Sequence, residues 1–152
     1  MADSFSLDYL GIQKYIRNKY PLLMIDYVDD VLPGKYANGY KNLTNNDWFF
    51  RNHFPGDNIM PGSLQIEAIT QMCAIAINTL PNMENDTVKS IEVKSRFIAP
   101  AVPGDKLLIE TTIESFRRGL ARCSGKGIIN GSVICELECL LLAENEAKKY
   151  LP

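Results

Sequence analysis

The residues best suited to acid–base chemistry in this chain are one histidine and one glutamate, His53 and Glu67, in the same short stretch. His53 is the only histidine of the 152 residues, and histidine is the side chain that titrates in the range needed for proton transfer near neutral pH. Glu67 stands between the apolar residues Ile66 and Ala68, and burial favours the neutral form of a carboxyl group. A base paired with a protonated acid is typical of a proton-transfer enzyme.

A short loop and a long helix must hold these two residues. Pro61 and Gly62 follow the segment of His53, and proline suits the first turn of a helix because its missing N–H has no helical acceptor there. The run from 62 to 78 is apolar on most sides, which is typical of a buried helix. Its polar residues, including Glu67, lie in the N-terminal half. The pattern predicts a central buried helix over about 62–78 with one polar end.

The remaining segments predict one further helix and a sheet. Residues 6–17 have helical spacing, and 22–31 and 35–43 read as a hairpin around the turn Pro33-Gly34. After residue 80, alternating apolar and polar residues predict main strands over about 88–143, namely 88–98, 106–116, 120–129 and 132–143. Long successive strands with short turns favour an antiparallel sheet. We therefore expect an α+β fold in a single domain over 1–152, with the sheet wrapping the central helix.

Composition excludes several classes of protein. Hydrophobic residues make up 46% and charged residues 22% of the chain, which is ordinary for a globular domain. The net charge of −2 gives no sign of nucleic-acid binding. The apolar runs are too short or too interrupted to span a membrane, and the first residues lack the pattern of a secretory signal. We expect a cytoplasmic protein with neither a nucleic acid nor a membrane as partner.

The cysteines predict no metal site. Cys73, Cys123, Cys135 and Cys139 form no C-x-x-C pair, and a second histidine that would complete a mixed zinc site is lacking. Cys135 and Cys139 are four apart in a predicted strand, so they share one face. We expect all four to be reduced, buried thiols that pack as small apolar side chains.

One long motif and several shorter ones carry a family resemblance. Residues 53–71 read H-F-P-G-x-x-x-M-P-G-x-L-x-x-E-A-x-x-Q, and residues 20–26, 46–50, 96–105 and 130–131 match in the same order. Over about 15–143 the sequence resembles the FabZ-type 3-hydroxyacyl-[acyl-carrier-protein] dehydratases, a hotdog-fold family. The resemblance implies the hotdog fold, with its long central helix wrapped by an antiparallel sheet. It also implies dehydration of a 3-hydroxyacyl thioester to the trans-2-enoyl thioester.

The same resemblance implies roles for individual residues. His53 would remove the α-proton of the thioester, and Glu67 would donate a proton to the departing 3-hydroxyl. The N–H of Gly62, at a helix N-terminus, suits the charge that develops on the thioester oxygen. Phe54 is expected in the core, in the substrate wall, or in both. Gln71 lies one turn after Glu67 and either orients its carboxyl group or serves as a structural hydrogen bonder.

Partners and assembly also follow from the resemblance. The substrate would arrive on the phosphopantetheine arm of acyl carrier protein, and no cofactor would be needed. Members of the family are homodimers whose active sites pair the histidine of one subunit with the glutamate of the other, often assembled as trimers of dimers. We therefore expect at least a homodimer, with a hexamer as the larger form.

Some positions depart from the family pattern and leave alternatives open. Asn58 stands where most members have proline, Asn52 where glycine usually precedes the histidine, and Asn18-Lys19 where His-Arg is usual. These departures make a polyketide-like or modified-lipid pathway an alternative to primary fatty-acid synthesis. A hotdog acyl thioesterase and a non-catalytic acyl-binding protein are the alternative functions. Isomerase relatives usually carry aspartate where Glu67 stands, so isomerisation is not favoured.

Overall fold

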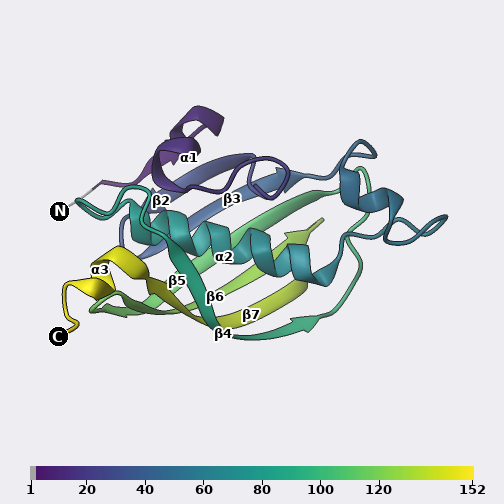
Figure 1. Cartoon of the computed structure of the whole chain (residues 1–152). Coiled ribbons are helices and arrows are strands. Elements are labelled where there is room, and N and C mark those ends of the chain that lie inside the picture. The colour runs from purple at the N-terminus through teal and green to yellow at the C-terminus, as the bar shows by residue number, and fades with distance from the viewer. Residues whose placement is uncertain (1–2) are drawn as a thin grey trace.

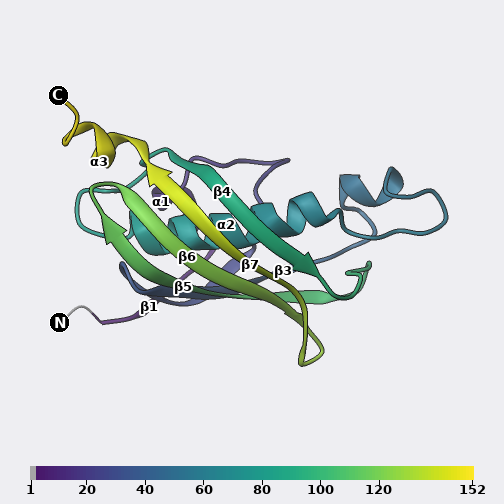
Figure 2. The ribbon, with the colours of Figure 1, turned by 90° about the horizontal axis from the view of Figure 1, so that it is seen from below.

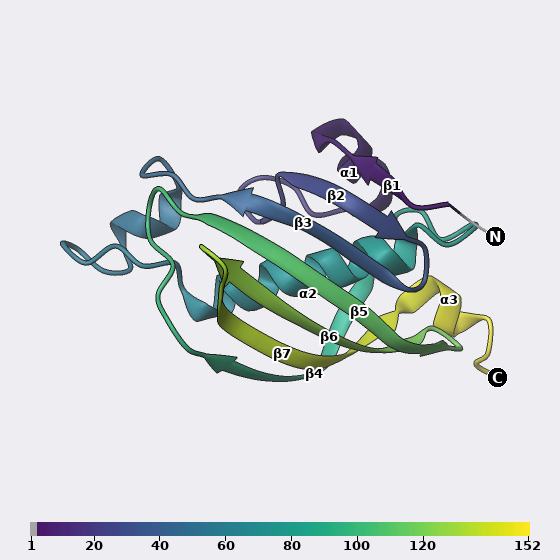
Figure 3. The ribbon, with the colours of Figure 1, turned by 180° about the vertical axis from the view of Figure 1, so that it is seen from behind.

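A curved sheet around one long helix dominates the computed structural model, which describes residues 3–152 (Figure 1). Figure 3 shows the same helix from behind, through the sheet that wraps it. In chain order the elements are β1 (Phe5–Leu7), α1 (Tyr9–Tyr15), β2 (Tyr27–Leu32), β3 (Tyr36–Asn42), η1 (Trp48–Arg51), α2 (Gly62–Asn78), β4 (Val88–Phe97), β5 (Lys106–Arg117), β6 (Leu120–Ile129), β7 (Ser132–Ala143) and α3 (Glu144–Lys148).

The sheet has seven strands in the order β1-β2-β3-β5-β6-β7-β4, and every neighbouring pair is antiparallel. Strands β5, β6 and β7 are long and joined by short turns, so they form the centre of the sheet in sequence order. Seen from below, β4 lies along one margin of the sheet beside β7 (Figure 2). β1 and β4 are therefore the two edge strands. The predicted α+β hotdog fold is confirmed.

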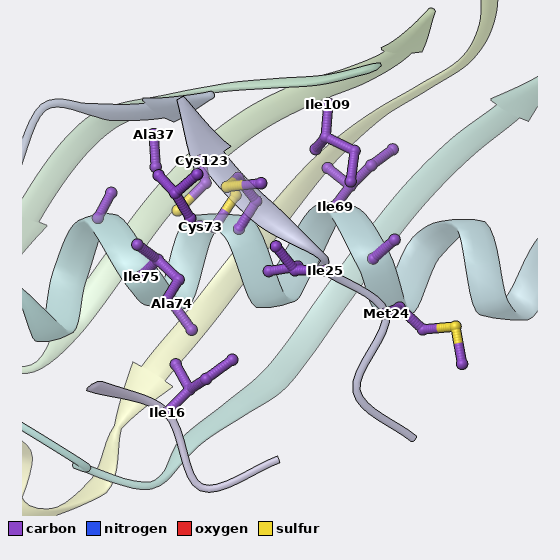
Figure 4. Packing of buried hydrophobic residues seen from close by; sticks show 14 of the residues in the cluster. Ile16, Met24, Ile25, Ala37, Ile69, Cys73, Ala74, Ile75, Ile109 and Cys123 are labelled. Carbon is purple, nitrogen blue, oxygen red and sulfur yellow. The ribbon is translucent and has the colours of Figure 1, made fainter. Parts of the chain in front are cut away.

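The central helix α2 has the predicted bounds and is buried along nearly its whole length. Its close approach to the sheet requires glycine in β6, because a Cβ at Gly125 would collide with the side chain of Ile69. Ile69 is fully buried, and burying a side chain of this size contributes about 1.5–3 kcal/mol. Figure 4 shows Ile69 and Cys73 of α2 directed toward Ile109 and Cys123 of the sheet. Helix α2 thus lies at the centre of the core, and its packing against the sheet fixes the position of its polar N-terminal end.

The N-terminal segment differs from its prediction. A helix was expected over about 6–17, whereas the structure has the short strand β1 followed by α1, which begins at Tyr9. The reason is a cap at Asp8, whose Oδ1 accepts a hydrogen bond from Gly11 N at 2.8 Å. Such a cap marks a helix start, and the residues before it pair with β2, with Phe5 opposite Val31.

The strand expected over 22–31 also begins later, at Tyr27. Residues before it are held by a side chain rather than by a neighbouring strand. Gln71 of α2 accepts a hydrogen bond from Met24 N at 2.8 Å and donates one to Leu22 O at 2.8 Å. The hairpin partner, β3, was predicted correctly within a residue of its ends.

None of the helices within residues 3–152 has both the length and the apolar character that crossing a membrane requires.

Candidate active site

Backbone hydrogen bonds within the loop stabilise the segment that carries His53. Ile59 N donates to His53 O at 2.8 Å, and Phe54 and Asp57 exchange N–H···O bonds of 2.8 and 2.9 Å. In the amide orientation that satisfies both of its polar atoms, Asn58 closes the same loop, because its nitrogen donates to Phe54 O at 3.2 Å and to Phe50 O of the preceding 3-10 helix η1 at 2.9 Å. The asparagine that replaces the usual proline therefore serves as a hydrogen-bonding brace.

The tautomer of His53 follows from one contact. Its Nδ1 lies 3.0 Å from Ile59 O, and a carbonyl oxygen can only accept, so Nδ1 carries the hydrogen in the neutral ring. Nε2 then holds a free lone pair, as a general base requires. Phe54 stacks on the imidazole with ring centroids 4.1 Å apart. Phe54 is exposed, so the expectation that it belongs to the core is wrong, and its role in the substrate wall stays a prediction.

Glu67 lies half-buried on α2 with one oxygen already engaged. Oε1 accepts hydrogen bonds from Gln71 Nε2 at 2.9 Å and from Asn18 Nδ2 at 3.5 Å. Both contacts end on Oε1, and within residues 3–152 no hydrogen bond is formed to Oε2. Asn18 was noted in the sequence only as a departure from the family pattern. Its proximity to Glu67 depends on a contact across 49 residues, which spacing along the chain does not show.

Gln71 makes the contacts that both of the roles considered for it require. The same amide that orients Glu67 also binds Leu22 O and Met24 N. Gln71 is 3% exposed, so its own side chain has little access to water. The carboxyl of Glu67 is therefore tied to the segment before β2 through one buried side chain.

Replacing Gln71 with leucine is expected to lower both stability and activity. The change leaves the N–H of the buried Met24 without a partner, which costs about 1–3 kcal/mol, and it also removes the bond to Leu22 O. The free energy of unfolding, measured with a chemical denaturant, should fall by about 2 kcal/mol or more. Turnover should also fall per folded molecule, so the loss of activity should be larger than the loss of folded protein explains.

The matched control is Gln13→Leu, because Gln13 makes only an exposed side-chain contact, with Lys19. A Gln71→Leu protein with unchanged turnover per folded molecule would show that Gln71 has no part in orienting Glu67.

Gly62 opens α2, so its N–H lies in the first turn, where no intrahelical acceptor exists. The ring of Phe97, at the end of β4, packs on this glycine so closely that an added Cβ would lie 2.7 Å from Phe97 Cζ. This close approach explains why the position needs glycine. The role of its N–H toward a thioester oxygen stays a prediction.

A cleft of about 370 Å³ opens beside Glu67. Its lining includes Asn18, Glu67 and Gln71, but among the described residues neither His53 nor Gly62 contributes to it. One chain thus brings the acid and its orienting residues together and leaves the base in a separate loop. The pairing of the two across subunits, implied by the family resemblance, stays a prediction.

The cysteines are buried, as expected. The Sγ atoms of Cys73, Cys123 and Cys139 lie within 4.8 Å of one another, one ligand short of the four that structural zinc takes. Hydrogen bonding with Cys123 raises the pKa of Cys73, and burial raises the pKa of Cys135 to about 11. These two thiols are therefore protonated at neutral pH and poor nucleophiles.

Comparison with known proteins identifies the family. The model of the FabA-like domain matches residues 16–138, which include His53 and Glu67. The chain belongs to the FabA-like family. It is 40% identical over 135 residues to the 3-hydroxyacyl-[acyl-carrier-protein] dehydratase FabZ of Syntrophotalea carbinolica, covering 88% of this chain and 92% of that protein. It is 35% identical over 150 residues to FabZ of Klebsiella pneumoniae, covering 96% and 99%.

Solved structures show the same fold at low identity. The dehydratase heterocomplex ApeI:P from Xenorhabdus doucetiae matches with a TM-score of 0.78 at 14% identity, covering 90% of this chain and 93% of that one. An uncharacterized protein from Pyrococcus horikoshii matches with a TM-score of 0.65 at 15% identity, covering 86% and 92%. At this identity the likeness concerns the fold alone.

Proposed function

We propose that this FabA-like chain is a 3-hydroxyacyl-[acyl-carrier-protein] dehydratase of fatty-acid biosynthesis, which converts its substrate to the trans-2-enoyl thioester. The observation that carries the proposal is the hydrogen bonding of the two candidate residues, His53 and Glu67. His53 presents a free Nε2 because Nδ1 is bound to Ile59 O. Glu67 presents a free Oε2 because its hydrogen bonds end on Oε1. The FabZ relatives named above, alike over nearly their full length, support the same reaction.

The chemistry needs two proton transfers and no redox step. Nε2 of His53 takes the α-proton, the electron pair of that C–H bond forms the α–β double bond, and the C–O bond at carbon 3 breaks. Glu67 Oε2–H donates to the departing oxygen, which leaves as water. The charge that gathers on the thioester oxygen is stabilised by the N–H of Gly62 at the start of α2. Solvent then returns a proton from His53 to Glu67.

The active site is completed by a second copy of the chain. His53 does not line the cleft of Glu67, so one subunit alone does not assemble the pair. Strand β4 offers the surface for a partner, since it is an edge strand with unpaired backbone groups. Ile91, Phe97 and Ile98, on or just after this strand, are exposed apolar residues, which are typical of an interface. Pairing at this edge brings His53 of the partner subunit to Glu67, and three such dimers form the larger assembly.

The substrate is delivered by acyl carrier protein, and the reaction takes place in the cytoplasm without a cofactor. A thioester of phosphopantetheine already makes the α-proton acidic, and His53 and Glu67 supply the base and the acid. The departures from the family pattern at Asn18 and Asn58 keep a related modified-lipid pathway as the alternative to fatty-acid synthesis.

Product analysis tests the proposed reaction directly. Purified protein is incubated with 3-hydroxyacyl thioesters on acyl carrier protein, and the products are identified by mass spectrometry. We expect the carrier-bound enoyl thioester, formed by loss of one water, and the reverse hydration from the enoyl side. Free acid together with free carrier thiol would instead identify a thioesterase. Unchanged substrate with measurable binding would identify an acyl-binding protein.

A further inference from the structure

Strand β4 has no buried residue, unlike the other long strands of the sheet. All of its residues, from Val88 to Phe97, are exposed or half-buried, whereas β5, β6 and β7 each contain several buried residues. Figure 2 shows β4 at the margin of the sheet, with β7 on one side and, in the part of the chain that the structure describes, no strand on the other. Such a free edge offers a row of unpaired backbone groups to another chain.

The side chains of β4 point to two different faces of the sheet. Val93 packs against the hydrophobic core, so it faces α2. Glu92 and Lys94 flank it and lie on the outer face, because successive residues of a strand alternate. Arg96 lies on the outer face too, where it forms an ion pair with Glu136 at 3.9 Å. Glu92 and Lys94 are exposed, and neither takes part in an ion pair within the described chain.

Symmetry limits how two copies of β4 can pair edge to edge. A twofold axis perpendicular to the sheet keeps each side chain on its own face, so one residue must lie opposite its own copy. With Val93 on the axis, Glu92 lies opposite Lys94 of the partner subunit, and this pair occurs twice. With Glu92 or Lys94 on the axis, that residue meets its own charge. With Ser95 on the axis, Lys94 meets Arg96 of the partner subunit.

The charges therefore distinguish these four registers. Opposite charges that face each other across two strands stabilise the pairing, and like charges destabilise it. Of the registers centred on residues 92–95, only the one centred on Val93 opposes no like charges. It also sets the half-buried side chain of Val93 against its own copy, which removes apolar surface from water on the inner face.

We propose that two subunits pair through antiparallel β4 strands with Val93 at the twofold axis, and that Glu92 and Lys94 are the positioning residues that select this register. The inference rests on the proposed dehydratase function and deepens it, because it specifies how the partner subunit is aligned at the two-subunit site. The occupant of the free edge is thus a second copy of this chain, recognised by a pattern of charges that is complementary to itself.

The register matters for catalysis because β4 connects the two parts of the candidate site. Two residues near its start line the cleft of Glu67. Its last residue, Phe97, packs on Gly62, where the loop of His53 leads into α2. Antiparallel pairing sets the end of one β4 beside the start of the other. It therefore brings His53 of the partner subunit to the side of the sheet margin where the cleft lies.

A change of register would separate the two catalytic groups. Moving the axis by one residue slides the partner subunit by two residues, which is about 7 Å along the strand. Reacting atoms must lie about 3–3.5 Å apart for efficient reaction. Only one register can therefore complete the site, and the residues that select it act on catalysis through the position of His53 in the partner subunit.

Single cysteine substitutions along β4 test the register directly. Residues directly opposite each other in an antiparallel pair have Cα atoms about 4.5–5.5 Å apart, which a disulfide can bridge. We expect Val93→Cys alone to form a covalent dimer in the presence of diamide, seen on a non-reducing gel. Glu92→Cys and Lys94→Cys should each stay monomeric on the gel when alone and cross-link when co-expressed. The native cysteines are buried, so wild-type protein is the control without a cross-link.

Charge reversal tests the role of the two ion pairs. Lys94→Glu sets like charges opposite each other at both places, so it should raise the dissociation constant of the dimer about tenfold or more at low salt. The double variant Glu92→Lys/Lys94→Glu restores opposite charges and should return the constant to within about threefold of the wild type. Analytical ultracentrifugation measures the constant, and dehydratase activity should be lost and regained with it. Lys126→Glu is the matched control, because Lys126 pairs with Glu110 on the outer face away from this edge.

The outcomes separate the register from the proposed function. A cross-link of Glu92→Cys or Lys94→Cys alone, no cross-link of Val93→Cys, or a double variant as weakly dimeric as Lys94→Glu overturns the register. If wild-type protein forms the enoyl thioester while Val93→Cys fails to cross-link, the dehydratase function stands and the register is wrong. If Val93→Cys cross-links as expected and wild-type protein forms no enoyl thioester, the register stands and the proposed function fails.

Discussion

Replacing His53 with alanine is expected to lower kcat/KM for dehydration by about 10²–10⁴-fold, the usual contribution of a general base. No other histidine is present to substitute for it. The hydrogen bonds that hold the Glu67 carboxyl come from Asn18 and Gln71, so the acid keeps its place in the variant. The loss should therefore appear in turnover, measured as enoyl thioester formed per unit time.

Rescue with free imidazole supplies the control for His53→Ala. The variant leaves a gap beside the exposed ring of Phe54, where a small base can enter from solvent. Added imidazole should restore part of the activity and should leave wild-type activity unchanged. Full activity in His53→Ala without any added base would exclude His53 as the base.

Replacing Glu67 with glutamine is expected to lower kcat by about 10²–10⁴-fold, a loss similar to that expected for His53→Ala. The amide is nearly the same size as the carboxyl, and its oxygen can still accept from Gln71, as Oε1 does now. It has no acidic proton to give to the departing hydroxyl. The defect is thus expected in the chemical step, with little change in the melting temperature.

Two further variants make the Glu67 result specific. Glu67→Asp keeps a carboxyl group on a side chain that is shorter by one methylene, so a part of the activity should remain. Glu84→Gln makes the same chemical change at an exposed position and should behave like the wild type. If Glu67→Gln dehydrates as fast as the wild type, proton donation by Glu67 is wrong.

Much of this fold could be predicted from the sequence because its pattern is strong. Strands β5 to β7 alternate regularly and helix α2 is apolar on most sides, so the side on which their apolar residues are buried is clear. The bounds of β4 to β7 and of α2 agree with the prediction within a residue or two. The first strand and α1 were merged in the prediction because residues 5–8 also fit helical spacing. Their pairing with β2 is a long-range contact, and a local pattern contains no signal for it.

The site was predictable in its residue types but less so in its connections. The link between Glu67 and Gln71 follows from their spacing of one helical turn. The attachment of Gln71 to Leu22 and Met24, and of Asn18 to Glu67, joins segments about fifty residues apart. These contacts exist only because the segment before β2 folds over α2. The separation of His53 from the cleft of Glu67 likewise depends on the path of the loop after η1.

We propose that each active site combines His53 of one subunit with Glu67 of the other. Co-expression of His53→Ala and Glu67→Gln chains with different affinity tags allows mixed dimers to be purified. Each mixed dimer contains one site in which both residues are intact and one site in which both are changed.

The measurement compares the dehydratase activity of these mixed dimers with the activity of either variant alone. Two-subunit sites predict about half of the wild-type activity in purified mixed dimers, since a twofold-symmetric dimer has two equivalent sites. Sites built within one chain predict no recovery, because every chain then lacks either its base or its acid. Activity of the mixed dimers as low as that of the parent variants would show that His53 and Glu67 do not pair across subunits.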